Sequence, residues 1–222
     1  MELTQNMRVA ASGDPELEEF DTWTVSLGDG TAPVVGVDNL VQLKEELCTE
    51  IDPDRQDADM RKFCEEIYPQ LEKNYSDETY LEGRAILAPT NRKVDVINDF
   101  LTSKLPGAEN VLLSADQLTE EEDPFRFSVE YLNNLNPTGL PRHRLVLKAG
   151  QPLMLLRNLN PKKGLCNGSR LTFVRVLSNR LLECRISGEQ QNRRTVLIPR
   201  VTLRPKEGQY GFDWARRQFP GR

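Results

Sequence analysis

The sequence predicts an α/β protein with a helical N-terminal part, one strand–turn–helix unit and a small antiparallel β-barrel. Apolar residues recur with helical spacing over roughly the first 105 positions. From Arg144 onward they occur instead in short strands separated by Gly-, Asn- and Lys-rich turns. The chain has 222 residues, 38% of them hydrophobic, which is enough for one large domain or two small ones.

The helical part contains three expected helices. Asp14 and Pro15 suit the cap and first position of a helix that Gly28-Asp29-Gly30 ends. A second helix is expected over about 38–49, with leucines at 40, 43 and 47. A third opens at Asp57, and its apolar stripe has the most regular helical period of the chain. This stripe comprises Met60, Phe63, Cys64, Ile67, Tyr68 and Leu71.

The strand–turn–helix unit follows. Arg84–Ala88 is expected to be a short buried strand, and Asn91 is placed to cap a helix that Pro106-Gly107 ends. Residues 116–124 are acidic and are predicted to form a solvated loop. Residues 133–141, rich in Asn, Pro and Gly, are predicted to form an extended linker.

Six short strands are expected in the C-terminal half, and together they favour a small antiparallel barrel. They are 144–148, 152–157, 170–177, 181–186, 195–199 and 201–204.

The charge is divided unevenly between the two halves. Residues 1–141 hold 11 Lys and Arg against 30 Asp and Glu, whereas residues 142–222 hold 18 against 4. The net charge of −5 therefore hides an acidic half and a basic half that suits a polyanion. No apolar run is long enough for a membrane span, and the N-terminus has no secretory signal pattern.

Motifs for catalysis or metal binding are missing from the sequence. There is no G-x-x-x-x-G-K-[ST] (Walker A) loop and no G-x-S-x-G. Asp77-Glu78-Thr79-Tyr80 looks like a magnesium-holding acidic (Walker B) motif, but no apolar strand precedes it, so we reject it. The four cysteines form no C-x-x-C pair, which predicts no structural metal. His143 is expected on the surface of the linker.

The basic half offers the one positive signal. Its cations are spread over the strands and turns of the expected barrel, which favours anion binding over ordinary surface charge. Aromatic residues are sparse there, so extensive base stacking is not expected. The cations are Lys148, Arg157, Lys162, Lys163, Arg170, Arg175, Arg180, Arg185, Arg193 and Arg194.

Several segments, in order along nearly the whole chain, resemble PIF-type (petite integration frequency) superfamily 1 DNA helicases, in particular the Helitron-like branch. The segments are 3–8, 86–91 with Val94, Asp95, Ile97 and Asn98, 132–141, 147–158, 164–171 and 216–220.

The resemblance implies a fragment of a larger motor. It suggests a partial RecA-like α/β region with a helical N-terminal segment (1–131), a linker (132–143), an SH3-like 2B barrel (144–205) and a return to the second lobe (206–222). The first RecA-like lobe, with both Walker motifs, and the C-terminal motifs of the family are expected to lie outside these residues.

The resemblance also suggests roles for individual residues. Arg8 resembles the arginine that reaches the γ-phosphate of ATP, a role open to it only in a complete motor; otherwise it is an exposed arginine. Thr90 and Asn91 match a turn that contacts the single-strand backbone, and helix capping is an alternative or additional role for both. Asn167, with Gly168, suits either DNA contact or a hairpin turn with positive φ.

The expected function is therefore a fragment of an ATP-dependent 5′-to-3′ DNA helicase acting in repair, recombination, telomere maintenance or transposition. The family uses ATP and Mg²⁺, but this chain alone is expected to bind neither and to be inactive. The expected partners are single-stranded DNA and the missing first RecA-like lobe, with no membrane, in the nucleus or mitochondria. The alternatives are a non-enzymatic nucleic-acid-binding or interaction module, or an inactive transposon-derived fragment. The expected DNA-contact residues are Thr90, Asn91, Lys148, Arg157, Lys162, Lys163, Asn167 and Arg170.

Overall fold

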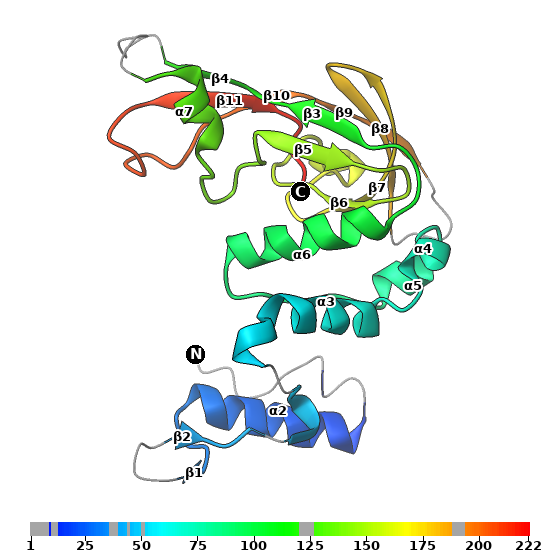
Figure 1. Ribbon diagram of the computed structural model, residues 1–222, viewed down its shortest axis with the longest axis vertical. Helices are drawn as coiled ribbons and strands as arrows, with labels where there is room; N and C mark the ends of the chain where they lie inside the picture. The colour runs from blue at the N-terminus through cyan, green and yellow to red at the C-terminus, as the bar shows by residue number, and fades with distance from the viewer. Residues whose placement is uncertain are drawn as a thin grey trace. The chain divides into compact units, whose positions relative to one another are not determined.

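The computed structural model describes Val9 and residues 13–35, 40–43, 45–49, 52–119, 127–187 and 194–222. The chain forms two compact units, Met1–Asp54 and Arg55–Arg222. Figure 1 shows a first unit with one labelled helix and two short strands, and a second unit that combines helices with several small sheets. None of the helices in the described ranges is long and apolar enough to cross a membrane.

The first unit contains the expected N-terminal helix, α2 (Pro15–Gly28). The Asp14 carboxylate accepts a hydrogen bond of 3.0 Å from the Glu16 backbone N–H, and Pro15 occupies the first turn. The helix predicted over 38–49 is wrong where the structure describes it. Instead, β2 (Leu40–Val41) pairs with β1 (Val34–Val35), and only a short 3-10 turn, η1 (Glu45–Leu47), follows. The β-branched pair in β1 offers a strand partner, which local helical spacing does not reveal.

The second unit begins with helices that follow the expected stripe only in part. The predicted third helix ends at Ile67, because Pro69 disfavours helical backbone at Tyr68 and cannot itself continue the helix. Leu71 therefore begins a separate short helix. The helical elements of this unit, after η2 (Pro53–Arg55) at the unit boundary, are α3 (Gln56–Ile67), α4 (Leu71–Asn74), α5 (Glu78–Glu82), α6 (Asn91–Lys104), α7 (Val129–Asn134) and the 3-10 turn η3 (Pro161–Lys163).

The strand predicted at 84–88 is not formed. This segment has no ladder partner, and Leu87 is 94% exposed. Every strand pair among the described residues is antiparallel, so the parallel pairing expected of a strand–turn–helix unit is not present there. The helix of that unit, α6, is confirmed, but its cap is Thr90 and Asn91 is its first helical residue.

The strands predicted in the basic half are confirmed with small changes at their ends. The structure adds two strands at 110–118, so the acidic-loop prediction is wrong for 116–118; residues 120–124 lie outside the described ranges. It also adds a strand at 214–218. The strands of this unit are β3 (Asn110–Leu113), β4 (Ala115–Leu118), β5 (Arg144–Leu147), β6 (Pro152–Met154), β7 (Arg170–Ser178), β8 (Leu181–Ile186), β9 (Thr195–Pro199), β10 (Val201–Leu203) and β11 (Trp214–Gln218).

These strands form three sheets, with the orders β6-β7-β8-β9, β10-β11-β4 and β3-β5. The four-stranded sheet and the β3-β5 sheet pack around one hydrophobic core, which includes Leu147, Leu171, Phe173, Ile198 and Phe219. The described strands do not close into a single hydrogen-bonded barrel, so the fold is a mixed α/β arrangement of small antiparallel sheets. The SH3-like barrel stays a prediction.

The linker predicted at 133–141 begins two residues later, at Leu135. Ser128 caps α7 by accepting a hydrogen bond of 3.2 Å from the Tyr131 backbone N–H, and the helix continues to Asn134. From Leu135 to His143 the chain has no regular element before it enters β5. This segment leads directly into the basic part of the chain.

Candidate nucleic-acid interface

The loop between β6 and β7 has a backbone fixed by its own hydrogen bonds. Asn160 and Leu165 exchange backbone hydrogen bonds of 3.0 and 3.1 Å, and the Ser169 hydroxyl donates to the Gly164 carbonyl at 2.7 Å. Gly164 and Gly168 have φ of +76° and +87°, a region that glycine enters without strain. The loop therefore holds its side chains in defined positions.

This loop exposes three of the expected DNA-contact residues. Lys162 and Lys163 lie on η3 and are both exposed. Asn167 is exposed too, and its backbone N–H donates to the Asn158 side-chain oxygen at 2.8 Å. Gly168, the residue after it, takes the positive φ expected of a hairpin turn. Two adjacent ammonium groups on a rigid turn suit the phosphates of a nucleic-acid backbone.

Arg170 follows the same loop as the first residue of β7 and is exposed. It also lines a cleft of about 350 Å³ against the helical part of the unit. Burial raises the pKa of the Tyr68 hydroxyl in this cleft, while the charges of Arg170 and Arg84 lower it. Arg170 therefore lies between the exposed loop and the cleft.

The cleft is predominantly apolar. One wall is α6, and the other is β6 with the beginning of β7; Figure 1 shows α6 next to the sheet that contains β6. Its apolar lining comes from Leu71, Leu81, Ala85, Ile86, Val94, Ile97, Leu101, Leu105, Pro152, Leu153 and Met154.

Two of the expected contact residues are engaged inside the protein. Lys148 is 6% exposed, and its ammonium group donates to the Leu105 carbonyl at 2.9 Å, at the C-terminal end of α6. It also lies 3.7 Å from the Glu109 carboxylate. Arg157 is half-buried and donates to the Leu156 carbonyl at 3.2 Å. Both side chains thus use part of their hydrogen-bonding capacity within the protein and offer less of it to DNA.

Thr90 and Asn91 lie at the start of α6. The Thr90 hydroxyl accepts from the Lys93 backbone N–H at 3.4 Å, so Thr90 does cap the helix. The side-chain oxygen of Asn91 accepts from Arg222 at 2.9 Å, and Arg222 also pairs with Asp95. The structure brings neither residue to the lysine-bearing loop. Arg8 lies outside the described residues.

The strands and connecting segments of the four-stranded sheet carry further cations. Arg175 on β7 pairs with Glu183 on β8, with 2.5 Å between Nε and Oε2. Arg180 and Arg194 are exposed and Arg185 is half-buried. Arg193 lies outside the described residues.

A buried charge cluster lies among β4, β11 and the segment before β5, and no sequence pattern indicates it. Arg216 and Asp116 are both completely buried at the side chain and form an ion pair with 2.7 Å between Nη2 and Oδ2. Gln218 is also fully buried and donates to the carbonyls of Leu112 and His143, each at 3.0 Å. Charged side chains are expected on the surface, so alternation along 214–218 could not have revealed these contacts.

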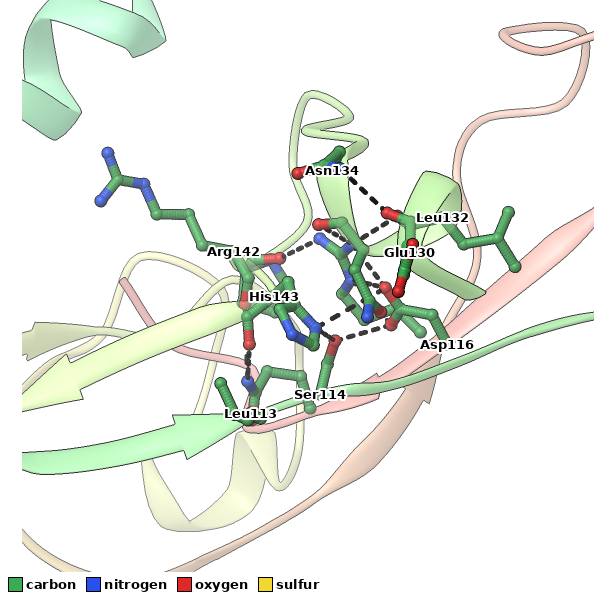
Figure 2. Close-up of polar contacts among 12 residues, drawn as sticks. Leu113, Ser114, Asp116, Glu130, Leu132, Asn134, Arg142 and His143 are labelled. Atoms are coloured by element: carbon green, nitrogen blue, oxygen red, sulfur yellow. Dashed lines mark hydrogen bonds and ion pairs between the residues drawn. The ribbon is translucent and has the colours of Figure 1, made fainter. Parts of the chain in front are cut away.

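His143 joins this cluster and is not the surface residue expected. Its side chain is 22% exposed, and Nδ1 lies 2.8 Å from the Ser114 hydroxyl (Figure 2). Burial lowers the pKa of His143; the nearby Asp116 raises it and Arg216 lowers it further. The imidazole is therefore held in its neutral form more strongly than a free histidine.

The described residues contain no group of three or more His, Cys, Asp or Glu that could hold a metal ion. The printed sequence also lacks a phosphate-binding G-x-x-x-x-G-K-[ST] loop. Within the described ranges, therefore, no acidic cluster suits Mg²⁺.

Exposed cations on a fixed turn are typical of surfaces that bind polyanions. Residues 130–176, which contain this turn, match the family described as DNA helicase Pif1, 2B domain. The resemblance to PIF-type helicases is confirmed over these residues, while the Helitron-like branch stays a prediction.

Among solved structures, the crystal structure of Pif1 helicase from Candida albicans is similar, with 16% sequence identity and a TM-score of 0.44. The similarity covers 83% of this chain and 47% of that chain, so this chain spans about half the length of that helicase. No match was found among curated proteins.

Proposed function

We propose that this chain is the nucleic-acid-binding portion of a PIF-type helicase and that it binds the backbone of single-stranded DNA. The observation that supports this most strongly is the match of residues 130–176 to the Pif1 2B domain. Within that segment, Lys162, Lys163 and Arg170 are exposed on and beside a loop of fixed geometry. The basic half around them carries 18 Lys and Arg against 4 Asp and Glu.

The proposed contact is electrostatic and largely independent of sequence. Each ammonium or guanidinium group that neutralises a phosphate releases a condensed counterion, so affinity falls as salt rises. In the complete helicase, this binding would serve ATP-dependent 5′-to-3′ unwinding in repair, recombination, telomere maintenance or transposition. The 222-residue chain alone would bind DNA without hydrolysing ATP.

The test is a fluorescence-anisotropy titration of a labelled single-stranded oligonucleotide at several NaCl concentrations. The Lys162→Gln/Lys163→Gln variant should bind more weakly at low salt. Its slope of log affinity against log salt should fall by about 1.4, because each lost contact to a single strand contributes about 0.7.

The matched control is Lys62→Gln/Lys73→Gln, which removes the same charge from exposed positions on α3 and α4. It should leave the slope nearly unchanged. An equal fall of the slope in both variants would show that binding depends only on the net charge of the protein. It would refute the assignment of the contact to the loop. No salt-dependent binding at low salt would instead favour the inactive-fragment alternative.

ATP turnover is tested separately. The purified chain, mixed with ATP, Mg²⁺ and single-stranded DNA, should release no phosphate above a blank without protein. Robust turnover that resists further purification would overturn the proposal that this chain is not catalytic by itself.

A further inference from the structure

Four side chains from three parts of the chain form one hydrogen-bonded row: His143, Ser114, Asp116 and Arg216. The Ser114 hydroxyl lies 2.8 Å from His143 Nδ1 and donates to Asp116 Oδ1 at 2.7 Å (Figure 2). Arg216 donates to the same carboxylate from Nε at 3.0 Å and from Nη2 at 2.7 Å. The row runs from a partly exposed imidazole to a fully buried ion pair.

The hydrogen-bond directions determine where the proton of His143 lies. A serine hydroxyl has one hydrogen, and an ionised carboxylate can only accept. Since the Ser114 hydrogen points to Asp116, its oxygen must accept from His143, and Nδ1 must therefore carry the proton. The neutral ring then keeps its lone pair, and its only protonation site, at Nε2.

The same row holds the segment that leads into β5. Arg216 donates to the carbonyls of Pro141 and Leu132, each at 3.1 Å. The backbone N–H of Ser114 donates to the His143 carbonyl at 2.9 Å. Residues 132–143 are thus attached to β11 and to Ser114 largely through their backbone carbonyls, and α7, which Ser128 caps, contacts β4.

Two charged groups face the imidazole, and they oppose each other. Asp116 comes from β4 and Arg216 from β11, and the Asp116 carboxylate is already neutralised by Arg216. Arg142, the neighbour in the chain, pairs with Asp95 and Asp99 of α6, and Figure 2 shows its guanidinium pointing away from the ring. Burial has the largest effect and lowers the pKa of His143, Asp116 favours the charged ring, and Arg216 disfavours it by less.

We propose that His143, Ser114, Asp116 and Arg216 form a pH-sensitive latch that seats residues 128–143 on β4 and β11. The latch is closed when His143 is neutral with its proton on Nδ1. When a solvent proton adds to Nε2, the ring becomes a cation whose side chain is only 22% exposed, and the segment loosens. The new N–H is the only covalent bond formed, and the hydrogen bonds that hold the segment break as it loosens.

The direction with pH follows from the lowered pKa of seated His143. In the loosened segment His143 would titrate near its ordinary pKa of about 6.5. Because the loosened form takes up the proton at higher pH, the latch is fully effective above about pH 6.5. It weakens as the pH falls through the lower pKa of the seated ring.

The first experiment is ¹⁵N NMR of the side chain of His143, which is the single histidine of the chain. Above about pH 7 the spectrum should show the Nδ1–H tautomer, whereas a free imidazole favours Nε2–H. The titration midpoint should lie below that of the urea-unfolded chain. A predominant Nε2–H tautomer in the native chain would overturn the proposal, as would a midpoint at or above the unfolded value.

The second experiment is hydrogen exchange of the 128–143 amides between about pH 7.5 and pH 5, corrected for intrinsic exchange. Opening should increase on acidification by tenfold for each unit between the two measured pKa values. His143→Asn keeps an N–H donor near Nδ1 without titrating, so it should abolish this increase. An unchanged acid-induced increase in that variant would refute the latch.

The role of Ser114 is tested with Ser114→Ala, which removes the hydroxyl that accepts the Nδ1 proton of His143. His143 should then return to the Nε2–H tautomer, read by the same NMR experiment. If the Nδ1–H tautomer remained in this variant, Ser114 would not determine which nitrogen of His143 carries the proton. That result would overturn the proposed latch.

Discussion

Removing the carboxylate of Asp116 should strongly destabilise the second unit. Asp116→Ala leaves the Arg216 guanidinium without its anion, in a site where both side chains are fully buried. Arg216 would keep hydrogen bonds to the carbonyls of Leu132 and Pro141 but would lose three donated to the carboxylate. The remaining carbonyl dipoles cannot replace a full negative charge.

The expected loss is about 3–5 kcal/mol, the usual effect of breaking a buried ion pair by removing one partner. Because a protein of this size has a free energy of unfolding of about 5–15 kcal/mol, much of the stability would be lost. At about 2–4 °C per kcal/mol, the melting temperature should fall by about 6–20 °C.

The assay is urea unfolding followed by circular dichroism and by tryptophan fluorescence. Trp214 is a suitable reporter because its buried ring lies 5.1 Å from the Arg216 guanidinium. Arg175→Ala, which breaks the exposed pair with Glu183, is the control and should cost at most about 1 kcal/mol.

The double variant Asp116→Leu/Arg216→Met separates charge from packing. Removing both charges together should recover a large part of the loss, because no unpaired ion is left buried. A loss below about 1 kcal/mol in Asp116→Ala, or a double variant as unstable as the single one, would refute this reasoning.

Two further predictions concern the core and the thiols. Gly221→Ala should cost about 1–3 kcal/mol in urea unfolding, because the new methyl group would lie 2.8 Å from the buried Leu153 side chain; Gly211→Ala, which meets nothing within 4 Å, should cost far less. Burial raises the pKa of Cys184 to about 12. At neutral pH this thiol should therefore resist a disulfide reagent in the native chain and react only on unfolding. The exposed Cys48 should react at once. Fast native labelling of Cys184 would contradict its buried position, and equal costs for the two glycine variants would contradict the close packing at Gly221.

The elements predicted best from sequence are those with a strong local pattern. The Asp14–Pro15 start of α2, the helix α6 and the strands β5 to β10 all follow from caps, turns and apolar spacing. The helix predicted over 38–49 was wrong because Leu40 and Val41 pair with Val34 and Val35 as a strand. The predicted strand at 84–88 has no ladder partner among the described residues.

For the candidate site, sequence reasoning found the charges but not their environments. The sequence does not distinguish Lys162 from Lys148. In the structure Lys162 is exposed on a turn, whereas Lys148 donates a hydrogen bond to a carbonyl at the end of α6. Arg216 lies in the 216–220 segment that resembles the family, and its buried pairing with Asp116 bridges 100 positions of the chain.

The sequence by itself determined the separation of acidic and basic halves, the helical and strand-rich regions and the resemblance to PIF-type helicases. These properties depend on composition, periodicity and short motifs, which are local. Only the tertiary structure decided which cations remain at the surface and where the proton of His143 lies. Both depend on burial and on hydrogen-bond partners that come from distant positions in the chain, since the energy of a charge is set by what surrounds it.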